Sequence, residues 1–327
     1  MNSKPTLLVS KNKTVFQTSY LEEKWEQYFN IEILDINKTY DNQSTVVVSD
    51  WLDYYWSADK KERLLASRGI RQVIDHCWDS WDSRLDNSAD FTLRPRDFMW
   101  INESIWYKHL GYDKLELASN PDRDFLLLMN KKAPFRTKLY NKITPVLSDN
   151  IYSYVGHGVP LQNSQDQTKN NSNLDWQRYT DPIWYTSTRF SIVSESTVKP
   201  AGIIALSDEV FLNDDINVSE KTLKPCAFKH PSVIWGQAGT LAWQKRQGFE
   251  TFDHCVDETY DTVEDKDIRF EKVVEQINLC IADKTIFTDD LTKQKLEHNY
   301  NHFYNEEVVM KLFREQMVDP LLEFIES

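Results

Sequence analysis

The chain has 327 residues, of which 40% are hydrophobic, and its 11 Trp, 15 Tyr and 16 Phe supply ample material for packed cores. This composition excludes a disordered chain, and the length suits two α/β domains of about 150 residues each. The 38 basic and 51 acidic side chains give a formal net charge of −13, which disfavours extended nucleic-acid binding unless basic residues gather in a cleft.

Cysteine usage and hydropathy indicate in which cellular compartment the protein is expected. The four cysteines form no CxxC pair and have no His-rich companion spacing, so we expect reduced thiols rather than a zinc site or a disulfide framework. The N-terminus has no basic leader followed by a long apolar core, and no window reaches about 18 apolar residues. We therefore expect a soluble, cytoplasmic protein without a membrane span.

The first third of the chain alternates short apolar runs with helical segments. Strands are predicted at 6–10, 31–36, 44–49 and 72–75, with helices at 19–29 and 58–67. Short runs that are fully apolar are typical of a parallel sheet covered on both faces, and the alternation is that of a doubly wound domain. We place a first Rossmann-like domain at residues 1–120, with turn formers at 118–124 as the linker.

The same rhythm restarts after the linker. Strands are predicted from Phe125, at 151–155, 190–193, 203–211 and 232–235, and helices from Pro134, from Ser219 and at 240–247, with a polar surface loop at 161–176. We place a second Rossmann-like domain at residues 121–290. A helical segment at 291–327, broken near Pro320, is predicted to pack back on the domains.

Basic residues follow the strand that opens the second domain. Lys131, Lys132 and Arg136 lie in the loop and first helical turn after this strand, and Pro134 suits the start of the helix. Because ligands of open α/β sheets bind outside the carboxyl ends of strands, this segment is a candidate phosphate receiver. The alternative is a solvated basic loop.

A second cluster follows two later strands of the same domain. Glu195 comes after the strand at 190–193, where a carboxylate can hold a sugar or ribose hydroxyl. Ser219 is a predicted N-cap, Glu220 can accept ribose hydroxyls, and Lys221 offers positive charge to phosphate beside open helix amides. The alternatives are an ordinary capped surface helix and a Glu195 that caps the next element.

Carboxylates also follow strands of the first domain. Asp50, Asp53 and Asp75 lie at or just after the ends of the predicted strands, among many Trp and Tyr residues. A carboxylate in such an apolar setting can act as general base on an acceptor hydroxyl. The alternative is that the aspartates are caps and that the aromatic residues pack in the core.

Other motifs give no support to metal or cofactor chemistry. The acidic run at 253–261 is predicted to be a solvated loop rather than a metal site. The Asp-x-Asp pairs at 122–124 and 265–267 do not follow strands, as a metal-bound diphosphate requires. The chain has no GxxxxGK[ST], GxGxxG or GxSxG motif. We therefore predict no metal and no resident cofactor.

Several short motifs together resemble a known enzyme group. They are FSIVSE at 190–195, VSEKTLKP at 218–225, HPSVI at 230–234, GTL at 239–241 and GFETF at 248–252. With the Asn130–Arg136 loop, they resemble fucosyltransferase- and exostosin-like glycosyltransferases of the GT-B fold, including phage and bacterial members. The resemblance covers roughly residues 125–270. Lys131 and Lys132 depart from it, because arginine is common at those positions.

The resemblance implies a fold and a function. It implies two Rossmann-like domains facing a cleft, with the nucleotide-sugar donor in the C-terminal domain and the hydroxyl acceptor in the N-terminal one. By position, Lys132, Arg136, Glu195, Ser219, Glu220 and Lys221 would bind the donor.

The expected reaction is metal-independent, inverting sugar transfer from a nucleoside diphosphate sugar. The acceptor is a glycan, a small molecule or, less favoured by the net charge, a hydroxymethylated base in phage DNA. A non-catalytic nucleotide-sugar-binding protein of the same fold and an interaction module using the aromatic first domain are the rival readings.

Overall fold

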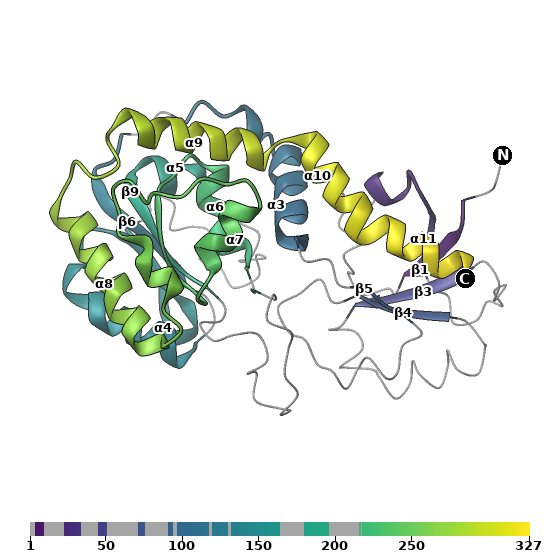
Figure 1. Ribbon diagram of the computed structural model, residues 1–327, viewed down its shortest axis with the longest axis horizontal. Coiled ribbons are helices and arrows are strands. Elements are labelled where there is room, and N and C mark those ends of the chain that lie inside the picture. The colour runs from purple at the N-terminus through teal and green to yellow at the C-terminus, as the bar shows by residue number, and fades with distance from the viewer. Residues whose placement is uncertain are drawn as a thin grey trace. The chain divides into compact units, whose positions relative to one another are not determined.

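The computed structural model describes residues 4–9, 23–33, 45–50, 71–75, 91–93, 97–117, 120–129, 132–163, 180–195, 216 and 218–327. The chain forms two compact units (Figure 1). The first combines Met1–Gly111 with Asn305–Ser327, and the second is Tyr112–Tyr304.

The first unit is built on a parallel five-stranded sheet. Its strands are β1 (Thr6–Val9), β2 (Asn30–Ile33), β3 (Thr45–Asp50), β4 (Arg71–Asp75) and β5 (Phe91–Leu93). The order β2-β1-β3-β4-β5, with each pair parallel, is one of the common doubly wound orders. The predicted parallel α/β architecture is therefore confirmed for this unit.

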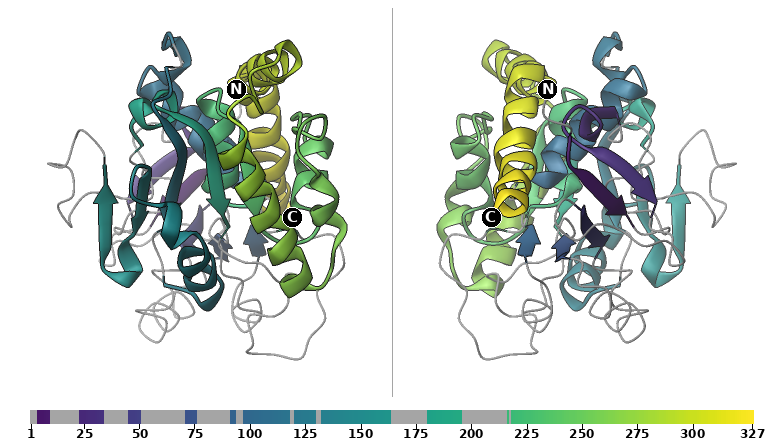
Figure 2. Two further views of the ribbon diagram at one scale, coloured as in Figure 1. Left: turned by 90° about the vertical axis from the view of Figure 1, so that its left-hand side faces the viewer. Right: turned by 90° about the vertical axis from the view of Figure 1, so that its right-hand side faces the viewer.

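C-terminal helices complete the core of the first unit. They are α10 (Glu306–Phe313), a π-helical turn (Arg314–Val318) and α11 (Asp319–Glu326), which together form the yellow rod in Figures 1 and 2. Phe313 meets Trp25 edge-on at 4.8 Å between ring centroids, and Phe324 stacks on Phe91 at 5.0 Å. These ring contacts, of which Trp25 and Phe313 are fully buried, tie the end of the chain to the N-terminal part of the first unit.

The helix α3 (Phe98–His109) starts against this rod. Asp97 donates its backbone amide to Gln316 Oε1 at 3.0 Å, and Gln316 Nε2 donates back to Asp97 Oδ2 at 2.6 Å. Gln316 lies in the π-helical turn, which turns its side chain out of the regular helical register. The pair satisfies polar groups of both elements inside the unit.

The second unit has a five-stranded mixed sheet. Its strands are β6 (Arg123–Met129), β7 (Ile151–Tyr154), β8 (Val159–Gln162), β9 (Thr188–Ser194) and β10 (Ser232–Trp235), in the order β10-β9-β6-β7-β8. Counted within the unit, this is the Rossmann order 3-2-1-4-5, with β8 antiparallel at the edge. The order reverses between β6 and β9.

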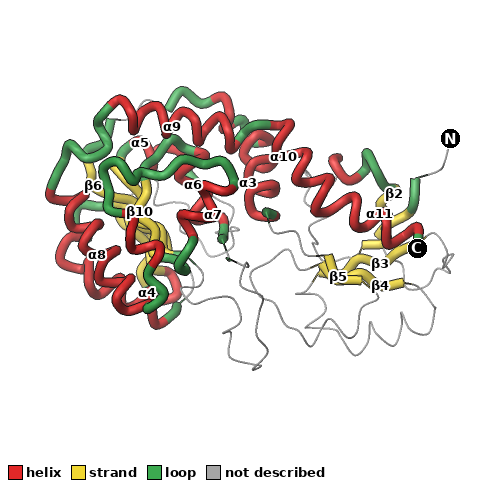
Figure 3. Tube along the Cα trace, viewed as in Figure 1, coloured by secondary structure: helices red, strands yellow, loops and turns green. Residues whose placement is uncertain are grey.

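Helices cover both faces of this sheet (Figure 3). Right-handed crossovers that run in opposite directions from the reversal point put α4 (Pro134–Ile143) and α6 (Glu220–Ala227) on opposite faces. The remaining helices of the unit are α5 (Pro182–Thr186), α7 (Thr240–Arg246), α8 (Lys266–Ala282) and α9 (Asp290–Phe303). The helix α8 shares the face of α4, where Phe270 meets Trp235 edge-on and Lys138 pairs with Asp267.

Several sequence predictions need correction. Residues 161–162, predicted as loop, end β8, and the helix α3 was not predicted. The predicted helical segment at 291–327 ends at Phe303 and restarts at Glu306, and Pro320 lies in the first turn of α11 rather than at a break. The predicted helix at 58–67 and strand at 203–211 lie outside the described residues.

Candidate functional site

The topology singles out the carboxyl ends of β6 and β9. The order of the second sheet reverses between these adjacent strands, and the helices that follow them leave to opposite faces. A crevice opens at such a reversal point, and it is where ligands of open α/β sheets bind. Arg136 follows β6 by way of α4, and Glu195 follows β9 directly. The geometry thus brings together two residues predicted from the sequence.

The start of α6 is capped as the sequence predicts. Ser219 is the N-cap in an extended conformation, and its Oγ accepts from the backbone amide of Lys221 at 3.4 Å. The same Oγ accepts from Lys221 Nζ at 3.1 Å. Ser219 is 0% exposed, so this cap is an interior feature rather than a surface one.

Glu195 lies directly beneath this cap. Its Oε2 accepts from Ser219 Oγ at 2.5 Å, and its Oε1 accepts from the Ser219 amide at 3.2 Å and from Thr222 Oγ1 at 2.5 Å. Short hydrogen bonds to an ionised acceptor are among the strongest in proteins. The Glu195 carboxylate therefore fastens the first turn of α6 to the end of β9.

Arg136 joins the same strand end from the opposite face. It is 2% exposed, and its Nη2 donates to the carbonyl of Ser194 at 3.2 Å and to that of Glu195 at 3.0 Å. These carbonyls belong to the last residue of β9 and to the residue that follows it. A buried guanidinium thus places a permanent positive charge at the reversal point.

Oppositely charged side chains at the site stabilise one another's ionised forms. Lys221 Nζ lies 2.8 Å from Glu220 Oε1, and both side chains are largely buried. Burial works against the Glu220 carboxylate, but Lys221 and Lys224 outweigh it and lower the pKa of Glu220 to about 2. Burial likewise works against the Lys221 ammonium, but Glu220 and Glu195 raise its pKa. With Arg136, the described residues of the cluster include three cations and two carboxylates, an arrangement that favours an anionic ligand.

The start of α4 differs from that of α6. Its N-cap is Ala133, which offers no side-chain oxygen to the amides of the first turn, and Pro134 occupies the first turn as predicted. Lys132 precedes it and is exposed. Because a helix N-terminus carries partial positive charge and a lysine lies nearby, this end of α4 can share in holding a phosphate group.

A glycine-containing loop closes in on Glu195 from β10. A Cβ atom on Gly236 would lie 2.9 Å from Thr240 Oγ1 and 3.4 Å from Glu195 Cγ. Arg269, 2% exposed, donates to the Gly236 carbonyl at 3.1 Å. The loop therefore requires glycine at this position, and its backbone reaches the candidate site.

The predicted first-unit carboxylates fall at a similar place in their own sheet. Asp50 and Asp75 are the last residues of β3 and β4, and their Cα atoms are partners in the ladder. The order of this sheet reverses between β1 and β3, so both residues lie at its carboxyl edge near the reversal point. Asp53 lies outside the described residues.

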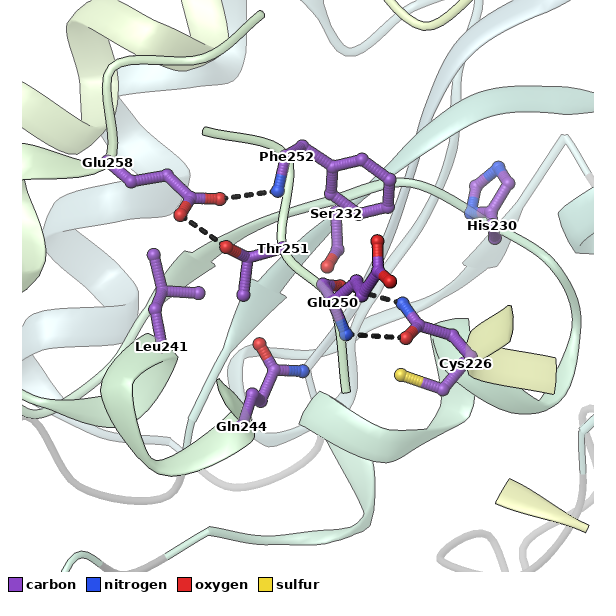
Figure 4. Close-up of a pocket in the computed structure, with 10 residues that line it drawn as sticks. Cys226, His230, Ser232, Leu241, Gln244, Glu250, Thr251, Phe252 and Glu258 are labelled. Carbon is purple, nitrogen blue, oxygen red and sulfur yellow. Dashed lines mark hydrogen bonds between the residues drawn. The ribbon is translucent and has the colours of Figure 1, made fainter. Parts of the chain in front are cut away.

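The acidic run at 253–261 is only in part the solvated loop that was predicted, because Asp253 and Asp257 are exposed whereas the side chains of Glu258 and Asp261 are largely buried. Asp261 caps α7 by accepting from the amides of Leu241 and Ala242, each at 3.0 Å. Glu258 accepts from Thr251 Oγ1 at 2.6 Å and from the Phe252 amide at 2.7 Å (Figure 4). Further on, Asp265 is the N-cap of α8. These carboxylates satisfy backbone amides, and within the described part of the chain no three His, Cys, Asp or Glu side chains gather as a metal site.

The small pocket in Figure 4 is separate from the reversal point. It lies beside Ser232, the first residue of β10, and so at the opposite edge of the sheet from Glu195. Its cavity of about 10 Å³ has room for a single water molecule. A nucleotide does not fit there.

Sequence reasoning missed two participants in the cluster. Lys224 stands four residues after Glu220, the spacing of a helical ion pair, so a local signal for it exists. Thr222 contacts a carboxylate that is 27 residues away in the chain. No local sequence pattern predicts such a contact.

Comparison with known proteins gives one structural likeness. No family model matches the chain, and no curated protein matches its sequence. A crystal structure of an alpha1,3-fucosyltransferase with GDP matches over 95% of this chain and 94% of that chain, at 12% identity and a TM-score of 0.43. Among the described residues, no helix is long and apolar enough to cross a membrane.

Proposed function

We propose that the protein is a glycosyltransferase that moves a sugar from a nucleoside diphosphate sugar to a hydroxyl acceptor. The observation that carries the proposal is the buried, positively charged cluster of Arg136, Glu220, Lys221 and Lys224 at the reversal point between β6 and β9. A diphosphate supplies the negative charge that this cluster favours, and a ribose supplies hydroxyl donors for a carboxylate.

In this proposal, each group of the cluster has a distinct role. Lys221 and the α4 amides contact the diphosphate, with Lys132 at the entrance, and Glu220 accepts hydrogen bonds from the ribose hydroxyls. Arg136 acts through its charge, because its Nη2 is engaged with the end of β9. As the bond between the anomeric carbon and the diphosphate oxygen breaks, the cations stabilise the negative charge left on the nucleoside diphosphate.

An aspartate of the first unit completes the proposed reaction. Asp50, Asp53 or Asp75 accepts the proton of the acceptor hydroxyl while its oxygen attacks the anomeric carbon from the face opposite the leaving group. The configuration at that carbon is then inverted. No metal is required in this scheme, because the cations take the part of a divalent ion.

The acceptor class follows from the charge of the chain. A net charge of −13 repels DNA, so a glycan or a small molecule is favoured over a hydroxymethylated base in phage DNA. Competition by DNA that weakens as salt rises would instead favour the base.

A thermal-shift panel tests the donor half of the proposal. Nucleoside diphosphates and nucleotide sugars are each added with magnesium or with EDTA, because a ligand at about 100 times its Kd stabilises the fold by about 2.7 kcal/mol. Stabilisation by one nucleotide family, undiminished by EDTA, is expected. No shift with any nucleotide would contradict the proposal.

A transfer assay tests the catalytic half. Release of the nucleoside diphosphate is followed with an acceptor library and the donor that the panel identifies. Donor binding with no transfer to any acceptor and no hydrolysis, together with unchanged binding in Asp50→Asn and Asp75→Asn variants, would favour a non-catalytic nucleotide-sugar-binding protein.

A further inference from the structure

The position of Glu195 does not suit a ribose contact. The residue is 0% exposed, and three donors of the α6 cap, the Ser219 amide, Ser219 Oγ and Thr222 Oγ1, already point at its carboxylate. Because the residue is fully buried, a ligand hydroxyl could reach this carboxylate only by opening the packing around it, which would disturb these hydrogen bonds. Displacing a short, charge-assisted hydrogen bond inside the protein is unfavourable.

The hydroxyl of Ser219 connects Glu195 to Lys221. A serine hydroxyl has one proton to donate and two lone pairs to accept with. The 2.5 Å contact to Glu195 Oε2 takes the proton, because an ionised carboxylate can only accept. Both lone pairs then face Lys221, one receiving its backbone amide and the other its Nζ at 3.1 Å.

We infer that Glu195 is a positioning residue, which fixes the ammonium group of Lys221 by orienting the Ser219 hydroxyl. Its effect on a donor nucleotide rests on the proposed function, but the hydrogen-bond relay does not. If the carboxylate is lost, the Ser219 hydroxyl can rotate so that its proton points toward Lys221. The Ser219 hydroxyl then no longer offers an acceptor to Lys221 Nζ. Lys221 Nζ then still donates to Glu220 but loses its hydrogen bond to Ser219 Oγ.

Inorganic pyrophosphate separates this role from a ribose contact, because it carries the diphosphate charge without ribose or base. Its affinity and that of GDP, UDP, ADP and CDP are measured by titration calorimetry on the full chain. The variants are Glu195→Gln, Ser219→Ala and the double variant. Thr222→Val is the matched control, because it removes a donor to the same carboxylate without touching the relay to Lys221.

The relay predicts equal losses for both kinds of ligand. Glu195→Gln should weaken pyrophosphate and the preferred nucleoside diphosphate by the same factor, about 10-fold. The double variant should bind no more weakly than Ser219→Ala, and Thr222→Val should lose less than Glu195→Gln. A loss confined to the nucleoside diphosphate, additive losses in the double variant or no loss would overturn the assignment.

Hydrogen exchange keeps the test separate from the proposed function. If the unmodified chain binds none of these ligands, the proposed function fails, and the relay is judged from amide exchange of residues 219–222. Faster exchange there in Glu195→Gln, with an unchanged far-UV spectrum, supports the relay. Exchange equal to that of the unmodified chain refutes it.

Discussion

The two edges of the second sheet both carry charged side chains, but they are arranged differently. At the amino edge, Arg189 donates to Asp124 Oδ1 through Nε at 3.1 Å and Nη2 at 2.9 Å, and to the Cys280 carbonyl at 2.6 Å. Lys284 also pairs with Asp124. The cations at this edge pair with a carboxylate and with the carbonyls at the C-terminal end of α8. Their charge is therefore used in contacts within the protein.

At the carboxyl edge, the helices begin rather than end. The N-termini of α4 and α6 bring amides and partial positive charge, and Arg136 and Lys221 add full charges. The carboxylates of Glu195 and Glu220 offset only part of this. The comparison shows why a parallel sheet with helical crossovers binds anions at one edge, since the direction of the chain fixes which helix ends gather there.

Removing Lys221 should have the largest effect on the carboxyl edge. Lys221→Ala should lower kcat by about 100- to 1,000-fold, because the leaving diphosphate loses its closest proposed cation. A transfer assay with the donor found by thermal shift measures this loss. Retained turnover would contradict the role of Lys221.

Two further variants control for charge and folding. Lys221→Arg keeps the positive charge and should retain more activity than the alanine variant. Lys138→Ala removes an exposed lysine of α4 that pairs with Asp267, and it should leave turnover unchanged. Far-UV spectra of all three variants establish that the fold persists.

At the amino edge, His230 should make the fold sensitive to acid. Burial lowers the pKa of His230 from 6.5 to about 4, although its bond to the Thr188 carbonyl opposes this. The unfolded chain therefore binds a proton below about pH 6.5 while the folded chain does not, so stability present above that pH is lost as the pH falls toward 4. The loss is about 3 kcal/mol.

Urea unfolding at pH 7.5, 5.5 and 4.5 measures this dependence. His230→Gln removes the titrating group but keeps one acceptor for Ser191 Oγ and one donor for the Thr188 carbonyl. The free energy of unfolding of the variant should change less over this range. An equal slope in both proteins would assign the acid sensitivity to other groups.

Removing the Arg189–Asp124 ion pair at the amino edge should destabilise the fold without changing nucleotide affinity. Arg189→Ala leaves the partly buried Asp124 with Lys284 alone and removes the donor to the end of α8, a loss of about 1–3 kcal/mol. Lys284→Gln, at an exposed lysine, should cost less than about 1 kcal/mol. Urea unfolding and nucleotide titration of both variants measure the two effects. Weakened nucleotide binding in Arg189→Ala would show that the two edges are coupled.

A smaller effect is expected for a structural carboxylate at the carboxyl edge. Asp261→Asn loses one of the two acceptors that cap Leu241 and Ala242, which should destabilise the fold by about 1 kcal/mol. Nucleotide affinity should stay unchanged, because Asp261 serves α7 rather than the charged cluster. A change in affinity without a change in stability would place Asp261 in the binding site.

Local patterns predicted much of the second unit. The apolar run at Phe125 forms β6, and Pro134 lies at the start of α4 as predicted. Ser219 caps α6 as predicted. The start of α8 was not predicted, because its capping aspartate, Asp265, was weighed only as part of an Asp-x-Asp pair. Charge alone does not distinguish a solvated carboxylate from one that receives backbone amides.

The sequence by itself marked several strands and helix starts, among them β6, α4 and α6, because apolar periodicity, caps and prolines act over a few residues. It also marked Arg136 and Glu195 as residues that follow strands, and Lys221 as a cation at a helix start. Only the tertiary structure decided that β6 and β9 are neighbours at a reversal of strand order. The contact of Arg136 with the Ser194 and Glu195 carbonyls depends on that order, because hydrogen bonds between distant segments form only when the whole sheet brings their backbones together.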